Sequence, residues 1–349
     1  MRPRTLRNAL ATLTAVLAAA GSLTAAGPAA AQERPPGNDC SPAVSLTGFS
    51  DALDKTTHDD TYVGNLSALA RDRRGSLAAL SDRSSLFRLD ARTLKPQGVL
   101  PLADENGAPL DAEGLVVSRD GTYLVSSETE PSVRRYSRTG RILDRLPVPD
   151  ALRTAPAGRA QANGSFEGLT LLSGGRTLIA SMEYPLAGDP AGLVRFQTWQ
   201  RTGRGDFRLG AQYTYRTDPG LGVSEVTATP DGRLLVLERG FTSGVGNTVR
   251  LHLADHRADH VADHRADHVA DHRADRRGAT LGKTLLADLA DCPSLGATAK
   301  QPQPNPLLDN FEGMAVTGRS RGRLDVLIVS DDNQNAAQTT RFLRLRVRT

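Results

Sequence analysis

The sequence predicts an all-β fold, a β-propeller of five to six four-stranded blades. The main observation is a repeated motif: Glu-Gly, an apolar run, a glycine-containing turn, and a second apolar run that ends in an acid. The apolar residues alternate or occur in short bursts, which favours strands over a helical solenoid. Room for two further strands follows each copy, as a four-stranded blade requires.

Three copies of the motif are complete: "DAEGLVVSRDGTYLVSSE", "SFEGLTLLSGGRTLIASME" and "NFEGMAVTGRSRGRLDVLIVSDD". Their first acids align, and so do their last, in the pairs Glu113 and Glu128, Glu167 and Glu183, and Glu312 and Asp331. Turns such as "RDG" and "SGG" supply the glycine that hairpins need for positive φ.

Two weaker copies complete the count of five. "LSALARDRRGSLAALSDR" aligns Ser67 and Asp82 with the two acid columns, and "VSEVTATPDGRLLVLER" aligns Ser224 or Glu225 with the first and Glu238 with the second. The copies start at positions 67, 113, 167, 224 and 312, at spacings of 46, 54, 57 and 88 residues. A sixth, degenerate blade could lie in residues 184–222 or 40–62, or "AVSLTGF" could instead close the ring by joining the last blade.

The N-terminus divides the chain into a leader and a mature protein. Residues 1–31 run from arginines through an Ala/Leu-rich stretch to Ala29-Ala30-Ala31, the order of a secretory signal peptide. Thr, Gly and Pro interrupt the apolar run before the roughly 20 residues of a membrane span. We therefore expect a secreted protein with no membrane association after cleavage, an N-terminal segment at 32–61 and the propeller at 62–349.

Charge and cysteine content narrow the class further. Removing the leader takes away three arginines and no acid, so the formal charge falls from +4 to +1. The sequence has no basic cluster with interleaved aromatic residues, so nucleic-acid binding is not expected. The Arg-rich, Ala-rich composition suggests a high-GC bacterial genome. The chain has only two cysteines, Cys40 and Cys292, and in an exported protein these favour a disulfide, the alternative being two unrelated buried thiols.

The repeat also predicts a shared site. A residue at one repeat position of a propeller recurs as a ring around the axis, so Glu113, Glu167 and Glu312 should converge, with Glu225 nearby. Gathered carboxylates repel one another unless a positive group lies among them. We weigh two roles equally: each Glu caps its own blade by accepting backbone N–H groups, or the ring holds Ca²⁺ or another divalent cation, with Asn310 and Asp331 as further oxygen ligands.

The ordered set of motifs resembles the phytase-like domain, the "esterase-like activity of phytase" family. The matching stretches include "LSALARD", "NGSFEGLTLLSGGRTLIASME", "GVSEVTATPDGRLLVLERGF", "GKTLLADL" and "DNFEGMAV", and they run in family order across residues 62–347. The resemblance implies a secreted bacterial β-propeller assigned to phosphoester or ester hydrolysis. Motifs of the characterised calcium-dependent β-propeller phytases are absent, so no active site carries over from them.

Candidate chemistry follows from the side chains at hand. A serine hydrolase is disfavoured, because "GxSxG" is absent and His58 is the only histidine outside residues 252–272. Arg83, Arg239 and Lys283 could bind phosphate oxygens, or the arginines could pair with nearby acids. The tract "ADHRADHVADHRADHVADHRAD" at 254–275 could bind Zn²⁺ or Ni²⁺ as a helix, but an expanded loop repeat is the favoured interpretation.

These observations lead to one hypothesis and two alternatives. The leading one is a monomeric, divalent-cation-dependent hydrolase that acts on a small, possibly phosphorylated molecule through an axial carboxylate cluster. A non-catalytic propeller that binds an ion or a cationic ligand is the first alternative. A lactonase-type hydrolase with one cation held by Glu, Asn and Asp is the second.

Overall fold

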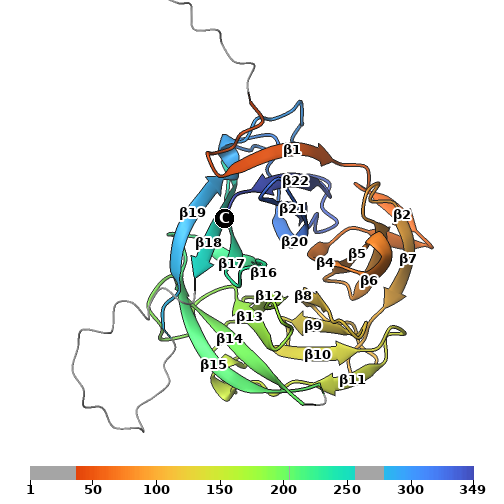
Figure 1. Cartoon of the computed structure of the whole chain (residues 1–349), viewed down its shortest axis with the longest axis vertical. Coiled ribbons are helices and arrows are strands. Elements are labelled where there is room, and N and C mark those ends of the chain that lie inside the picture. Colours follow the sequence, from red (N-terminus) through yellow and green to blue (C-terminus); the bar gives the residue numbers. More distant parts are fainter. Residues whose placement is uncertain (1–36, 204, 256–278) are drawn as a thin grey trace, which may run out of the picture. The chain divides into compact units, whose positions relative to one another are not determined.

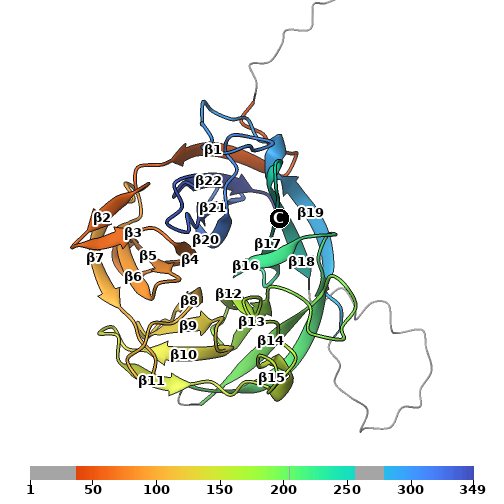
Figure 2. The same ribbon diagram turned by 180° about the vertical axis from the view of Figure 1, so that it is seen from behind.

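The computed structural model describes residues 37–203, 205–255 and 279–349, and these form a five-bladed β-propeller. Five four-stranded antiparallel sheets surround a central axis, with β4, β8, β12, β16 and β20 innermost (Figures 1 and 2). The predicted signal peptide and most of the His/Asp tract lie outside the described residues. Within the described residues, no helix is long and apolar enough to cross a membrane.

The strands follow the predicted repeat, and each sheet runs outward from the axis. The first blade has β4 (Leu66–Arg71), β5 (Ser76–Ser81), β6 (Ser85–Asp90) and β7 (Pro96–Pro101); the second has β8 (Ala112–Val117), β9 (Tyr123–Ser127), β10 (Ser132–Tyr136) and β11 (Ile142–Arg145). The third has β12 (Phe166–Leu171), β13 (Thr177–Met182), β14 (Leu193–Thr202) and β15 (Asp206–Arg216); the fourth has β16 (Gly222–Ala228), β17 (Leu234–Thr242), β18 (Gly246–Asp255) and β19 (Gly282–Asp288).

The fifth blade joins the two ends of the described chain. It contains β20 (Phe311–Ser320), β21 (Arg323–Ser330) and β22 (Phe342–Val347), and its outermost strand is β1 (Val44–Ser50), which pairs antiparallel with β22. The remaining elements are a hairpin of β2 (Thr56–His58) and β3 (Thr61–Val63) and the short 3-10 helices η1 (Arg73–Gly75), η2 (Asp150–Leu152) and η4 (Leu289–Asp291). The described residues therefore form no sixth blade: residues 184–222 contribute mainly β14 and β15 of the third blade.

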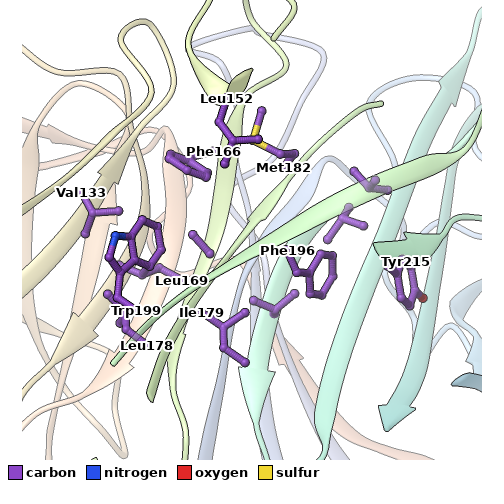
Figure 3. Packing of buried hydrophobic residues seen from close by; sticks show 14 of the residues in the cluster. Val133, Leu152, Phe166, Leu169, Leu178, Ile179, Met182, Phe196, Trp199 and Tyr215 are labelled. Atoms are coloured by element: carbon purple, nitrogen blue, oxygen red, sulfur yellow. The ribbon is translucent and has the colours of Figure 1, made fainter. Parts of the chain in front are cut away.

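Apolar side chains fill the spaces between neighbouring sheets. The largest cluster joins the second, third and fourth blades, and it includes Phe166, Trp199, Phe196 and Tyr215 (Figure 3). Phe166 meets Trp199 edge-on at 5.9 Å between ring centroids, and the indole N–H donates to Pro147 O at 2.7 Å. Burying each such side chain contributes roughly 2–3 kcal/mol, so the sheets hold one another at a set angle around the axis.

The predicted disulfide is confirmed. Cys40, which precedes β1, is bonded to Cys292, which follows η4, with an S–S distance of 2.04 Å and a sequence separation of 252 residues. The bond therefore links the ring-closing strand to the end of the fourth blade.

The glycine after each motif Glu is needed where innermost strands approach one another. A Cβ on Gly114 would lie 2.5 Å from Glu167 O, and one on Gly168 would overlap Val226 N and lie 2.7 Å from Glu225 Oε1. Neither glycine has a positive φ. Their role is close approach to the next blade rather than an unusual turn.

Replacing Gly168 with Ala is therefore expected to destabilise the propeller by about 3 kcal/mol, because the new methyl group meets backbone that cannot move aside. Gly48→Ala is the matched control: Gly48 also lies in a strand, yet its Cβ would meet nothing within 4 Å. Denaturant unfolding of both variants measures the difference. Equal stability of the two variants would contradict the close-approach explanation.

Candidate functional site

A cavity of about 320 Å³ opens at the end of the axis where the innermost strands begin, and we call it the axial cavity. Eight carboxylates line it, and Arg239 is the one cationic side chain among its described lining residues. The complete lining is Ser67, Asp82, Asp111, Glu113, Glu128, Asn163, Glu167, Glu183, Tyr184, Arg239, Asn310, Glu312, Asp331 and Asn333. The predicted convergence of Glu113, Glu167 and Glu312 is thus present in the structure.

A bulge at the start of each innermost strand brings the first acid column to the axis. The strand register shifts between Ala112 and Leu115 in the second blade, between Phe166 and Leu169 in the third and between Phe311 and Gly313 in the fifth. Each interval contains the motif Glu. A bulge leaves a residue outside the ladder and redirects its side chain, so the same irregularity places each Glu in the axial cavity.

The last acids of the motif come from the ends of the second strands. Asp82, Glu128, Glu183 and Asp331 each directly follow a second strand, β5, β9, β13 or β21. They therefore surround the first column at the same end of the axis. The two columns together give the axial cavity its negative charge.

The fourth blade departs from this pattern by one residue. In the third blade Phe166 pairs with Met182, and the terminal acid Glu183 is the next residue. In the fourth blade Val223, which corresponds to Phe166, pairs with Glu238 itself. Arg239, not Glu238, consequently occupies the terminal acid column. This corrects the alignment made from sequence, and it explains why a cation lies among the carboxylates.

The same offset removes Glu225 from the site. Glu225 takes the position of the motif glycine, and its Oε1 accepts hydrogen bonds from Val226 N at 2.8 Å and Leu169 N at 3.2 Å. Burial raises the pKa of Glu225 well above its usual value, although these backbone donors lower it. It does not line the axial cavity. Glu225 thus has the capping role that was one of the two expectations for the whole ring.

The three predicted phosphate-binding cations lie in different places. Arg239 forms ion pairs with Glu312 at 3.1 Å and Glu183 at 3.3 Å. Although burial lowers the pKa of Arg239, these carboxylates raise it above its usual value. Arg83 lies 3.6 Å from Asp82 with 68% of its side chain exposed. Lys283 does not line the axial cavity.

Lys283 belongs to a separate ionic cluster on the fourth blade. Its Nζ lies 2.7 Å from Asp218 and 2.6 Å from Glu238, and Glu238 also accepts a hydrogen bond from the Tyr215 hydroxyl at 2.6 Å. Asp218, Glu238 and His252 could by themselves form a metal-binding triad. The ammonium already balances both acids, so this cluster is a structural ion-pair network.

Burial and crowding raise the pKa values of several axial carboxylates. Burial is the largest cause for each, and neighbouring carboxylates add to it: the pKa of Glu113 and that of Glu167 lie well above the usual value, and that of Glu128 is raised to about 8. Burial also raises the pKa of Glu312 to about 7, although Arg239 lowers it. The site is thus short of positive charge.

Polar contacts hold two of the axial carboxylates in place. Asn310 Nδ2 donates to Glu312 at 2.9 Å, and Ser165 N donates to Glu128 at 3.1 Å. Ser67 is 1% exposed, and its hydroxyl has no hydrogen-bond partner in the described part of the chain. Carboxylate and amide oxygens and water are the ligands that Ca²⁺ prefers, so the lining residues fit a hard divalent cation.

The match to a family model accounts for the repeated motifs. Residues 61–334 match the model of the phytase-like family, described as "Esterase-like activity of phytase". The chain belongs to the phytase-like family. The match runs from β3 to just beyond Asp331 and Asn333, and so it includes the whole axial cavity.

One relative of this phytase-like chain is an uncharacterized secreted protein of Arthroderma benhamiae, 26% identical over 179 residues. The aligned stretch covers 39% of this chain and 35% of the relative, about a third of the latter's length. The name of that protein says that it is secreted and states no activity.

Three solved structures resemble this phytase-like propeller at low sequence identity. A gluconolactonase of Xanthomonas campestris, XC5397, is 16% identical over 82% of this chain and 73% of its own, with a TM-score of 0.41. U3-55K is 11% identical over 85% of this chain and 98% of its own, with a TM-score of 0.39. A Bacteroides caccae protein of unknown function is 12% identical over 74% and 68%, with a TM-score of 0.33. Likenesses this low carry no argument about the reaction.

Asp111 and Tyr184 line the axial cavity although the sequence did not indicate them. Asp111 lies two positions before Glu113 in "DAEG", where it reads as an ordinary loop acid. Tyr184 follows Glu183, and its hydroxyl hydrogen-bonds that carboxylate. A Cβ on Gly164 would lie 2.9 Å from the Tyr184 ring, and one on Gly222 would lie 2.8 Å away. The position of Tyr184 therefore depends on the space left by two glycines that lie elsewhere in the sequence.

Proposed function

We propose that this protein is an exported hydrolase that holds divalent cations, Ca²⁺ by ligand chemistry, in the axial cavity and cleaves a small phosphoester there. The observation that carries the proposal is the imbalance of eight carboxylates against Arg239 among the described lining residues. Membership in a family described by phytase and esterase-like activity supports the reaction class. The predicted signal peptide, the disulfide and the secreted relative support export.

The side chains divide the work of such a reaction. A bound cation would supply Lewis-acid stabilisation of the substrate's anionic oxygens. Arg239, held by Glu183 and Glu312, can donate to the same oxygens because a guanidinium presents several N–H groups in one plane. Glu312, whose pKa burial raises to about 7, can exchange a proton near neutral pH.

A serine-histidine mechanism finds no support in the described residues. Ser67 lines the axial cavity, but neither described histidine does: His252 lies in the Lys283 cluster, and His58 lies in β2. A buried serine without a base is a weak nucleophile. Cation-assisted chemistry is thus the better match to the residues present.

The direct test is a panel of phosphoesters and lactones assayed with EDTA, with added Ca²⁺ and with added Mg²⁺. We expect phosphoester cleavage that EDTA abolishes and Ca²⁺ restores. Lactone cleavage without phosphatase activity would favour a lactonase-type hydrolase instead. If no compound in the panel is cleaved, the enzyme proposal fails and a non-catalytic ion-binding propeller remains.

Arg239→Gln is expected to lower kcat/KM at least about 100-fold, because charge-assisted hydrogen bonds to the substrate are lost. Arg239→Lys should fall between Gln and wild type, since it keeps the charge but not the planar fork. The control is Arg83→Gln at the exposed rim, which should change kcat/KM less than about threefold. A larger loss in the Arg83 variant than in the Arg239 variant would assign substrate contact to the rim.

A further inference from the structure

We propose that the axial cavity binds two divalent cations side by side and that Glu128 is the carboxylate they share. This inference rests on the proposed cation site and deepens it. Two triads of potential ligands carry it: Asp111, Glu113 and Glu128 form one, and Glu128, Glu167 and Glu183 form the other. In each triad, one ligand oxygen from every residue lies within 4.8 Å of the others.

The spacing fits one ion in each triad. Ca²⁺ binds oxygens at about 2.3–2.6 Å, so two oxygens on the same ion lie at most about 5 Å apart. Both triads meet this limit as they stand. The first lies within the second blade, and the second joins Glu128 to the third blade, so the second ion would also link two sheets.

The charge of the two triads favours more than one ion. Their five carboxylates carry a charge of −5 when ionised. One divalent cation would leave −3, whereas two would leave −1 beside Arg239, whose guanidinium lies 3.3 Å from Glu183. Two ions thus bring the group close to neutrality, which a buried site needs.

The fourth blade shows how this fold balances a triad without a metal. Asp218 and Glu238, which form a potential metal-binding triad with His252, are bridged by Lys283 Nζ at 2.7 and 2.6 Å. No lysine or arginine bridges the acids of the first axial triad among the described residues, and Arg239 reaches only Glu183 in the second. The contrast assigns exogenous cations to the axial triads.

An independent observation also points to a ligand in the axial cavity. Ser67 lines it and is 1% exposed, and its hydroxyl has no hydrogen-bond partner among the described residues. A buried hydroxyl without a partner costs about 1–3 kcal/mol. A cation, or water held by a cation, supplies the missing partner.

Calcium titration calorimetry of the full chain, with bound calcium counted by elemental analysis after dialysis, tests the number of ions. We expect two ions in the axial cavity of the wild type. Glu113→Gln and Glu167→Gln should each remove one ion, a different one, with more than tenfold weaker binding at that site. Glu128→Gln should weaken both.

Glu130→Gln is the matched control, since Glu130 lies two residues from Glu128 but its side chain is 60% exposed and pairs with arginines. It should bind calcium as the wild type does, which would show that removing a nearby acid outside the axial cavity does not change the number of ions. If Glu113→Gln does not fold, Asp111→Asn tests the same triad. Loss of a single, common ion in the Glu113 and Glu167 variants would overturn the two-ion arrangement.

The outcome is separable from that of the proposed function. Binding stoichiometry is read without any substrate, so two ions without hydrolysis would uphold this inference and reject the enzyme. A single bound ion together with calcium-dependent hydrolysis would reject the two-ion inference and uphold the proposed enzyme.

Discussion

In EDTA, the melting temperature of the protein is expected to fall by roughly 5 °C or more as the pH rises from 5 to 8. Burial raises the pKa of Glu128 to about 8 and that of Glu312 to about 7. A carboxyl with a raised pKa in the folded state stabilises the fold fully below its unfolded pKa, near 4.3. That contribution is lost as the pH rises through the pKa of the folded state, so stability should decrease between about pH 4.5 and pH 8.

Added Ca²⁺ should reverse this dependence, because the ionised carboxylates that destabilise the empty site are the ligands of the ion. Scanning calorimetry across the pH range, with EDTA and with Ca²⁺, measures both effects. Glu128→Gln provides the control, since a neutral side chain cannot ionise and the pH dependence in EDTA should become shallower. A melting temperature in EDTA that rises from pH 5 to 8 would contradict the charge imbalance itself.

The fold and the shared site could be predicted because they depend on a repeat. The Glu-Gly pair recurs for two physical reasons that act on adjacent residues. The bulge turns Glu113 or Glu167 toward the axis, and the glycine that follows leaves room for the neighbouring innermost strand. A pattern with two such causes survives in the sequence as a visible motif. Neither cause specifies what the carboxylates bind.

The fourth blade shows where sequence reasoning ended. "SEV" offers two candidates for the Glu column, and nothing local decides between Ser224 and Glu225, because the choice depends on the pairing of β16 with β17. A slip of one residue exchanges the two faces of a strand. The same slip decides that Arg239 enters the axial cavity while Glu238 faces Lys283.

Loss of the Cys40–Cys292 disulfide is expected to lower the free energy of unfolding by about 5 kcal/mol. The bond closes a loop of 252 residues, and in the chain-entropy model a loop of this length restricts the unfolded chain by about that amount. Denaturant unfolding of the Cys40→Ser/Cys292→Ser variant, compared with the wild type with and without reductant, measures it. The reduced wild type should match the variant.

Reduction of the disulfide should raise hydrogen exchange unevenly along β1, because the two ends of this strand are held by different contacts. The disulfide and the Ser41 hydroxyl, which donates to Leu286 O at 2.5 Å, hold the segment before Val44. Beyond Ser50, Asp51 forms a bidentate ion pair with the buried Arg341 at 2.8 Å, and that contact survives reduction. Hydrogen exchange should therefore accelerate in residues 40–47 more than in residues 48–52. Uniform acceleration across β1 would mean that the ring opens as a unit, and unchanged exchange at both ends would mean that β1 holds the ring closed without the disulfide.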